Sequence, residues 1–174
     1  RHLYVNTENV TLCTRLEDGN VMNFSNDGGS TWGGFMPFSR IADWTLSAGD
    51  GLKVVDAEFQ TYSGSIFADC QITLDTTPPL VAAFSINSGD PVTNSTDVVL
   101  ETGYMDANDV WARYRNDGGQ WSQKEKLSGS PSYRSWKLRN AAGERAVYIE
   151  LSDIAGNVSV EYSDTIIYST GAAG

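Results

Sequence analysis

The sequence contains two copies of one module. Residues 21–32, VMNFSNDGGSTW, return as WARYRNDGGQW at 111–121, and the Trp-x-Leu at 44–46 returns at 136–138. A repeat of this length, built from strand-like runs and turn residues, indicates two similar domains in tandem rather than a solenoid whose units cannot fold alone. Half of the 174 residues is enough for a modest hydrophobic core in each copy.

Short stretches of alternating apolar and polar residues predict strands in both copies. A period of two is the strand pattern, and it occurs at 54–59 and 72–74 in the first copy and at 98–100, 146–151 and 165–167 in the second. Groups rich in Gly, Asn and Asp, which reverse the chain, separate these stretches. Because no helix of useful length is visible, we expect an all-β chain of two tandem antiparallel β-sandwiches.

Each copy also carries an Asn-Asp-Gly-Gly segment, at 26–29 and at 116–119. Asp-Gly supports a type I′ turn, so both segments predict tight hairpins. The aromatic residue before each turn and the Trp after it would then form a cross-strand pair with a structural role. The two pairs would be Phe24 with Trp32 and Tyr114 with Trp121.

The boundary between the copies is predicted at the linker Asp75-Thr-Thr-Pro-Pro79, which gives domains 1–76 and 77–174. Two consecutive prolines fix φ and remove two amide donors, so the preceding strand must stop there. Such a segment favours an extended conformation and should be stiffer than a Gly-Ser linker. We therefore expect it to restrict the relative orientation of the domains.

The copies differ in length near their beginnings. The second copy has residues 88–96 between its first strand and Val98, whereas the first copy passes from residues 3–5 to Val10 in four residues. The first copy is therefore predicted to lack a loop or a short edge segment.

Several segments together resemble bacterial Ig-like repeats, which occur in tandem in large prokaryotic secreted and cell-surface proteins. They are FSNDGGSTW at 24–32, WTLSAGDG at 44–51, LDTTPP at 74–79, SDIAGNVS at 152–159 and SDTI at 163–166. The resemblance covers nearly the whole chain. It implies an immunoglobulin-like or fibronectin-III-like sandwich and an extracellular, cell-surface setting, and it implies no common enzymatic activity.

The charge of the chain argues against two classes of partner. The formal net charge is −10, and binding of nucleic acid or of an anionic membrane surface requires clustered Lys and Arg. One short basic stretch is best interpreted as an outer strand face, and it consists of Lys124, Lys126, Arg134, Lys137 and Arg139. No apolar run approaches the roughly 20 residues of a membrane helix, so no membrane insertion is expected.

Few residues could carry catalysis. His2 is the single histidine, so a Ser-His-Asp triad or a multi-histidine zinc site is not expected. Acids such as Glu17 with Asp18, or Asp106 with Asp109, could converge with others, but they lie in turn-like segments that favour acids anyway. The chain is therefore predicted not to be an enzyme.

Calcium is the one cofactor that the sequence leaves open. Carboxylates and carbonyls from the loops of adjoining domains can share a hard cation, although no contiguous EF-hand loop is present. The alternative is that these acids are solvated or form Asx turns. The candidate ligands are Asp75 at the linker and the loop residues Asp18, Asp106, Asp109 and Asp153.

Cys13 and Cys70 both lie in the first copy, where they form a candidate disulfide. By chain entropy a bridge between them would stabilise the domain by roughly 4 kcal/mol. The strand phase is less favourable, because Val10 and Leu12 should point inward and leave Cys13 on the outer face. Free thiols and a bond to a neighbouring chain are the alternatives.

Aromatic residues are frequent, with 5 Trp and 8 Tyr. Trp44 and Trp136 begin the Trp-x-Leu strands, so we expect them in the core. The other aromatics near loops either pack against the strands or form a stacking platform for sugar rings. The candidates for such a platform are Trp32, Phe35, Trp121 and Tyr133.

Four asparagines stand in N-glycosylation sequons, which matter only in a source that glycosylates. They are Asn9, Asn23, Asn94 and Asn157.

The favoured prediction is a non-catalytic extracellular structural or adhesive protein, either a stalk segment or the subunit of a surface fibre. Its partners would be neighbouring Ig-like domains or copies of itself, with the segment from Arg1 to Asn6 adding to a sheet edge on a neighbour. The alternative is an accessory carbohydrate-binding module of a larger secreted enzyme, whose partner would be a polysaccharide.

Overall fold

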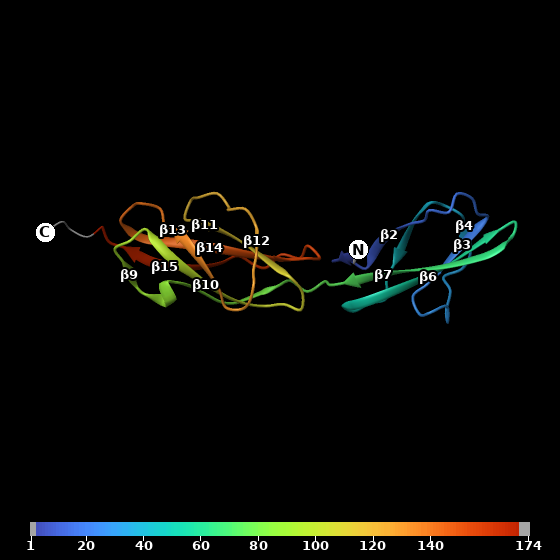
Figure 1. Cartoon of the computed structure of the whole chain (residues 1–174), viewed down its shortest axis with the longest axis horizontal. Coiled ribbons are helices and arrows are strands. Elements are labelled where there is room, and N and C mark those ends of the chain that lie inside the picture. The colour runs from blue at the N-terminus through green and yellow to red at the C-terminus, as the bar shows by residue number, and fades with distance from the viewer. Residues whose placement is uncertain (1–2, 171–174) are drawn as a thin grey trace. The chain divides into compact units, whose positions relative to one another are not determined.

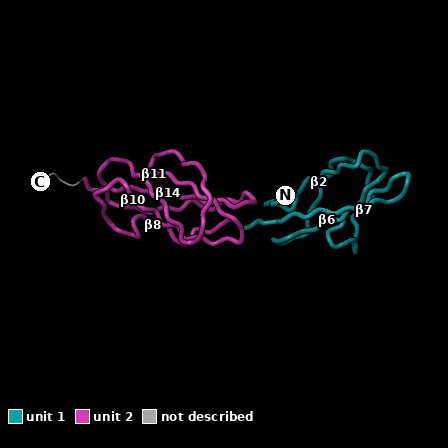
Figure 2. The backbone as a smooth tube through the Cα atoms, viewed as in Figure 1, with its two compact units in different colours: residues 1–77 teal, residues 78–174 magenta. Residues whose placement is uncertain are grey.

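The computed structural model describes residues 3–170, which fold into β-strands and one short 3-10 turn. The chain divides between Thr77 and Pro78 into two compact units, unit 1 and unit 2 (Figure 2), where the sequence predicted a division between residues 76 and 77. Each unit is a β-sandwich in which one strand pair of the described residues is parallel and the others are antiparallel, so the predicted fold class is confirmed. None of the helical turns in the described part of the chain has the length and apolar character that crossing a membrane requires.

Unit 1 is built from two layers of strands (Figure 1). One sheet has the order β1-β7-β6-β3-β4, and the other pairs β2 with β5. The strands are β1 (Leu3–Val5), β2 (Asn9–Cys13), β3 (Val21–Ser25), β4 (Met36–Pro37), β5 (Ile41–Thr45), β6 (Gly51–Thr61) and β7 (Gly64–Leu74).

The core of unit 1 lies between these layers, because alternate residues of each strand point inward. Phe24 packs on Trp44 across the layers with ring centroids 5.5 Å apart, and it meets Phe59 edge to face. Trp44 is half-buried against the core, as the Trp-x-Leu pattern predicted. The buried core residues are Met22, Phe24, Leu46, Val55, Ala57, Phe59, Ile72 and Leu74.

Unit 2 repeats this plan with one strand more among the described residues. Its sheets have the orders β12-β11-β14-β15-β9 and β13-β10-β8. The elements are β8 (Leu80–Ile86), the 3-10 turn η1 (Asn87–Gly89), β9 (Val92–Thr93), β10 (Asp97–Met105), β11 (Val110–Asn116), β12 (Glu125–Lys126), β13 (Ser132–Lys137), β14 (Gly143–Asp153) and β15 (Tyr162–Tyr168).

The core of unit 2 is larger, and Trp136 packs against it from β13. Tyr114 lies at its centre, with its ring centroid 5.9 Å from that of Trp136 and 6.3 Å from that of Phe84. The buried core residues are Val81, Phe84, Ile86, Val98, Leu100, Val110, Ala112, Tyr114, Leu127, Leu138, Val147, Ile149, Leu151 and Ile166.

The described residues of unit 1 include no equivalent of β8. In unit 1, β1 runs parallel to β7, and in unit 2 it is β9 that runs parallel to β15, so β1 corresponds to β9. Likewise β2 with β5 corresponds to β10 with β13. The prediction of a missing loop or short edge segment therefore underestimated the difference between the copies. The additional element of unit 2 is β8, a seven-residue strand that pairs with β10 along its length.

Two further expectations were wrong. The Asn-Asp-Gly-Gly segments do not join paired strands in a tight hairpin. In unit 1, β3 and β4 pair only at Val21 with Pro37 and at Met22 with Met36. In unit 2, β11 and β12 pair only at Trp111 with Lys126 and at Ala112 with Glu125. Trp32 consequently lies in the connection between β3 and β4. The segment expected to add to a neighbour's edge is also engaged within its own unit, because Leu3 to Val5 pair with β7, while Arg1 and His2 lie outside the described residues.

Candidate functional site

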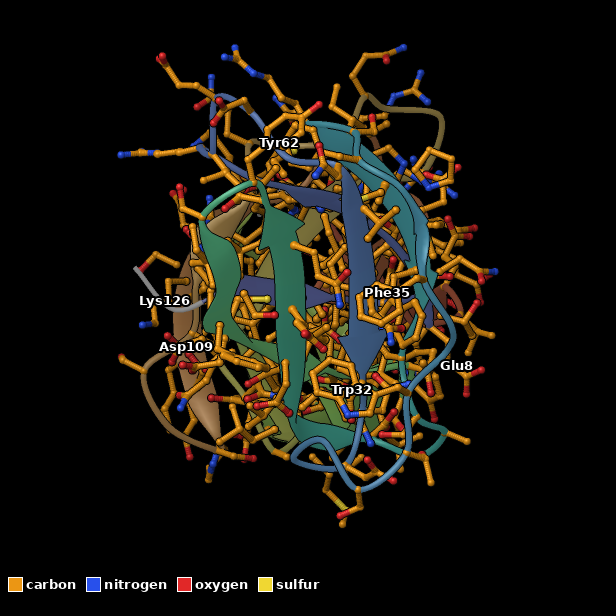
Figure 3. The ribbon with its side chains drawn as sticks, turned by 90° about the vertical axis from the view of Figure 1, so that its right-hand side faces the viewer. Glu8, Trp32, Phe35, Tyr62, Asp109 and Lys126 are labelled. Carbon is orange, nitrogen blue, oxygen red and sulfur yellow. The ribbon has the colours of Figure 1, made fainter. Side chains whose placement is uncertain are left out.

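The acids predicted as calcium ligands have other partners in the fold. The carboxylate of Asp153 accepts the N–H groups of Gly156 and Asn157 at 2.7 and 2.9 Å and the side-chain amide of Asn157 at 2.7 Å, so it holds the loop after β14. Asp109 forms an ion pair with Lys126 at 2.6 Å (Figure 3). These bonds satisfy the carboxylates without a cation.

The other three candidates are similarly dispersed. Asp106 accepts the N–H of Asn108, Asp75 accepts the N–H of Thr77, and Asp18 is exposed. Within residues 3–170 no group of three or more His, Cys, Asp or Glu side chains is placed to hold a metal ion. Calcium binding therefore stays a prediction.

Four of the five basic side chains in the basic stretch of the second copy are engaged in hydrogen bonds or ion pairs. Each of these side chains has a polar or acidic partner, which agrees with the interpretation as an outer strand face. The pairs are Lys124 with Ser152, Lys126 with Asp109, Arg134 with Glu125 and Lys137 with Asp97.

The aromatics predicted as a sugar platform do not gather in one place. In unit 2, Trp121 is covered by the guanidinium groups of Arg113 and Arg115, which lie 4.8 and 5.0 Å from its ring centre. Tyr133 stands on β13, in the other sheet, with 63 % of its surface exposed. In unit 1, Trp32 and Phe35 both come from the connection between β3 and β4 (Figure 3).

Trp32 does take part in a hollow, together with residues that the sequence analysis did not single out. The hollow has a volume of about 390 Å³ and lies over β6 and β7, with Phe67, Asp56 and Asp69 among its lining residues. Phe67 is 66 % exposed, and Asp56 lies directly opposite Asp69 across the strand pair. Two aromatic rings beside two carboxylates can stack on apolar faces of a ligand and accept hydrogen bonds from its hydroxyls.

The loop shape that places Trp32 over this hollow depends on Gly29. Its φ is +77°, and a Cβ there would come within 3.1 Å of the Trp32 ring. The sequence did contain a signal for this hollow. Phe67 and Asp69 are two residues apart and therefore share one face of β7, and Asp56 lies on the neighbouring strand β6. What the sequence did not show was that β6 and β7 place these acids opposite one another.

An acid in the loop between β5 and β6 holds the linker. Asp50 lies between β5 and β6, and its Oδ1 accepts the N–H and the hydroxyl of Thr76, both at 2.8 Å. Its Oδ2 accepts the hydroxyl of Thr77 at 2.6 Å. These three bonds, led by the one from the Thr77 hydroxyl, lower the pKa of Asp50.

A second arrangement is duplicated in the two units. The Asn26 side chain accepts a hydrogen bond from the Trp44 indole N–H at 2.9 Å and donates one to the Thr45 carbonyl at 3.0 Å. Asn116 makes the same two bonds with Trp136 and Lys137, at 2.9 and 3.1 Å. This Asn thus ties the end of β3 or β11 to a strand of the opposite sheet, which we call the Asn–Trp clamp.

The candidate disulfide is not formed. Cys13 and Cys70 are both free and exposed. They belong to strands of different sheets, β2 and β7, and both are among the residues that line one hollow. In unit 2 the equivalent positions are Glu101 and Asp164, where β8 contacts both strands.

Burial separates the four sequon asparagines into two groups. Asn23 and Asn157 are buried, so a glycan cannot be carried there in the folded chain. Asn9 and Asn94 are exposed, although the amide oxygen of Asn9 accepts a hydrogen bond from Thr45. Glycosylation stays a prediction for these two.

No protein-family model and no curated protein matches this sequence. Among solved structures, the chain is similar to the fibronectin(III)-like modules of Clostridium thermocellum CbhA, with a TM-score of 0.58 and 13% identity over 97% of this chain and 88% of that one. It is also similar to the FN1–FN3 domains of chicken CNTN1, with a TM-score of 0.54 and 11% identity, covering 94% of this chain and 65% of that one. These likenesses show the fold, in agreement with the Ig-like sandwich that the motifs imply.

Proposed function

We propose that this chain is a non-catalytic extracellular structural or adhesive protein, acting as a stalk segment or as a subunit of a surface fibre. The observation that carries the proposal is the attachment of the linker to unit 1 through Asp50. Its partners are neighbouring Ig-like domains or copies of the same chain.

The linker is restrained at every residue from Asp75 to Pro79. Asp75 donates its N–H to the Val5 carbonyl, and the two threonines that follow are bonded to Asp50. The prolines at 78 and 79 then limit φ by their rings. A chain segment fixed in this way transmits orientation and force better than a flexible tether, which is what a stalk requires.

The packing of the aromatic residues inside each unit supports the same proposal. In both units a Trp of the smaller sheet is held by the Asn–Trp clamp and packs on a core aromatic, Phe24 or Tyr114. Because this arrangement is repeated in both units, its benefit is to the stability of each sandwich. The resemblance to surface repeats and the fibronectin-III-like modules among the structural neighbours support an extracellular setting.

The test of the stalk role is Asp50→Ala in the full chain. Loss of three hydrogen bonds should widen the range of orientations between the two units, measured by residual dipolar couplings or by small-angle scattering. Asp18→Ala removes an exposed acid of the same unit and is the matched control. Equal interdomain order in the Asp50 variant, the Asp18 variant and the parent would contradict the proposal.

A second candidate function is an accessory carbohydrate-binding module, favoured by the hollow of Trp32, Phe67, Asp56 and Asp69. Its volume of about 390 Å³ is within the usual range of ligand sites. Affinity electrophoresis on a panel of soluble polysaccharides tests it, with Trp32→Ala and Phe67→Ala expected to abolish retardation and Trp121→Ala expected to retain it. A parent chain that no polysaccharide retards would remove this candidate.

A further inference from the structure

The sheet formed by β2 and β5 has an open edge on β2. In the described part of unit 1, β2 pairs with β5 alone. Its counterpart in unit 2, β10, is a central strand that pairs with β13 on one side and with β8 on the other. One side of β2 therefore presents backbone groups that unit 2 covers with a strand.

The pairing with β5 fixes which backbone groups face the open edge. Leu46 donates its N–H to the Glu8 carbonyl, and Thr14 donates its N–H to the Arg40 carbonyl. Because successive residues of an antiparallel strand alternate in direction, Thr11 and Cys13 direct their N–H and C=O groups away from β5. These are the groups that an added strand would bond.

The equivalent groups of unit 2 are bonded by β8 and the turn that follows it. Val99, which corresponds to Thr11, donates its N–H to the Asn87 side chain at 2.8 Å. Glu101, which corresponds to Cys13, lies opposite Ser85 of β8. The pairing of β8 with β10 in unit 2 therefore defines the register that an added strand would have on β2.

The open edge borders an apolar hollow of about 80 Å³ in unit 1. Leu12, Phe24, Val55 and Phe59 line it, together with the two cysteines. This is several times the space that one water needs, and the lining is largely apolar.

In unit 2 the corresponding region is filled by β8, whose Val81, Phe84 and Ile86 are buried in the core. The presence of β8 changes the exposure of equivalent leucines in the two units. Leu100 of β10 has 0% of its surface exposed, whereas Leu12 of β2 is only half-buried.

The two cysteines lie on either side of the position that a strand added to β2 would occupy. Ile86 of β8 donates its N–H to Asp164 of β15 at 2.8 Å, and Cys70 is the unit 1 equivalent of Asp164. Cys13 is the equivalent of Glu101, on the other side of β8. A strand seated on β2 would therefore pass between Cys13 and Cys70.

We propose that unit 1 binds an extended polypeptide strand that adds antiparallel to β2 and fills this hollow. The strand has the chemistry of β8, with apolar side chains at the positions equivalent to Val81, Phe84 and Ile86. The position equivalent to Ile86 lies opposite Leu12, and that equivalent to Phe84 lies opposite Thr14. The inference does not depend on the stalk role, since it concerns the fold of unit 1 alone.

The experiment uses the full chain under reducing conditions and a synthetic peptide of residues 79–90, PLVAAFSINSGD. The rate at which a thiol reagent modifies Cys13 and Cys70 is measured with increasing peptide. At a peptide concentration ten times its Kd, both rates should fall about tenfold, because only the unbound fraction reacts. The control peptide carries Phe84→Asp and Ile86→Asp and should give no protection.

A pair of protein variants tests the register. Thr11→Pro removes an N–H that faces the open edge and is not used by β5, so binding should be lost while unit 1 stays folded. Thr11→Val introduces the residue that unit 2 has at this position and should retain binding. Folding of both variants is checked by the thermal unfolding of unit 1.

Three outcomes would overturn the proposal. One is unchanged thiol reactivity at millimolar peptide, and another is equal protection by the control peptide. The third is a dimer in sedimentation experiments, with both cysteines protected before any peptide is added, because β2 would then pair with a second copy of the chain.

Discussion

The two units share one plan, but unit 2 is complete where unit 1 is open. The extra strand β8 makes β10 a central strand and closes the core, so Val98 and Leu100 are buried while their equivalents Val10 and Leu12 are half-buried. The burial of a repeated residue is therefore determined by the strands around it and not by its own sequence motif.

The repeated turn gives a second contrast. In unit 1, Asp27 of the Asn-Asp-Gly-Gly segment accepts hydrogen bonds from Thr31 and Ser25. In unit 2, Asp117 of the same segment forms an ion pair with Arg145 at 2.9 Å. The same acid therefore caps its own loop in one unit and binds a neighbouring strand in the other.

The largest expected effect is a difference between Leu100→Ala and Leu12→Ala. Loss of a leucine with no exposed surface should lower the free energy of unfolding of unit 2 by about 2 to 5 kcal/mol. Leu12→Ala should lower that of unit 1 by about 1 to 2 kcal/mol, because part of this side chain is already in water. Denaturant unfolding followed by NMR, which resolves the two units, measures both values.

Equal losses of unfolding free energy from these two substitutions would contradict this prediction, because they would mean that unit 1 buries Leu12 as deeply as unit 2 buries Leu100. A larger loss of unfolding free energy for Leu12→Ala in the presence of the residue 79–90 peptide would show that the added strand completes the core around Leu12.

The next effect concerns the Asn–Trp clamp, which both units share. Asn26→Ala and Asn116→Ala each remove two hydrogen bonds and leave an indole N–H without its acceptor, which should cost about 1 to 3 kcal/mol. Asn→Asp at either position keeps the acceptor for the indole and serves as the control. Similar losses in the two units are expected from thermal unfolding, and a loss confined to one unit would show that the clamp is not equivalent.

A smaller effect is expected from Asp27 at acid pH. Hydrogen bonds from the Thr31 side chain, the Thr31 N–H and the Ser25 hydroxyl lower its pKa from 3.8 to about 2. A carboxyl whose pKa is lower in the folded chain stabilises the fold above its unfolded pKa, and this contribution disappears as pH falls through the folded value. The stability difference between the parent and Asp27→Asn should therefore shrink between pH 4 and pH 2, and a constant difference would contradict this role.

Much of the fold could be predicted from the sequence because its signals are local. Alternation placed Val55, Ala57 and Phe59 on one face of β6, and the paired Trp-x-Leu segments gave the strands that close the smaller sheets. The resemblance to Ig-like repeats added the sandwich arrangement. These inferences depend only on neighbours in the chain or on a repeated pattern.

What could not be predicted depends on which strands lie beside each other. Matching the copies from their first strands hid the fact that Leu3 to Val5 correspond to β9, and so the missing β8 was taken for a loop. The predicted bridge between Cys13 and Cys70 failed for the same reason. Asp50 was overlooked because its partners, Thr76 and Thr77, lie 26 and 27 residues away.

The smallest effect concerns Cys70 and leaves the fold unchanged. Although Cys70 is an exposed residue, partial desolvation of its thiol raises the pKa, and the charges of Asp69 and Asp56 raise it further. In Cys13→Ser, which isolates Cys70, the rate of alkylation should therefore rise with pH around a midpoint above that of a free thiol such as glutathione. Asp69→Asn in the same background should lower the midpoint. It should not reach the value of the free thiol, because desolvation contributes more to the raised pKa than the charge of Asp69 does. A midpoint at or below that of glutathione would mean that the thiol of Cys70 is fully hydrated and would contradict this prediction. A raised one would mean that unit 1 keeps a neutral group where unit 2 has the carboxylate of Asp164, so that a strand seated on β2 would meet no charge from this residue.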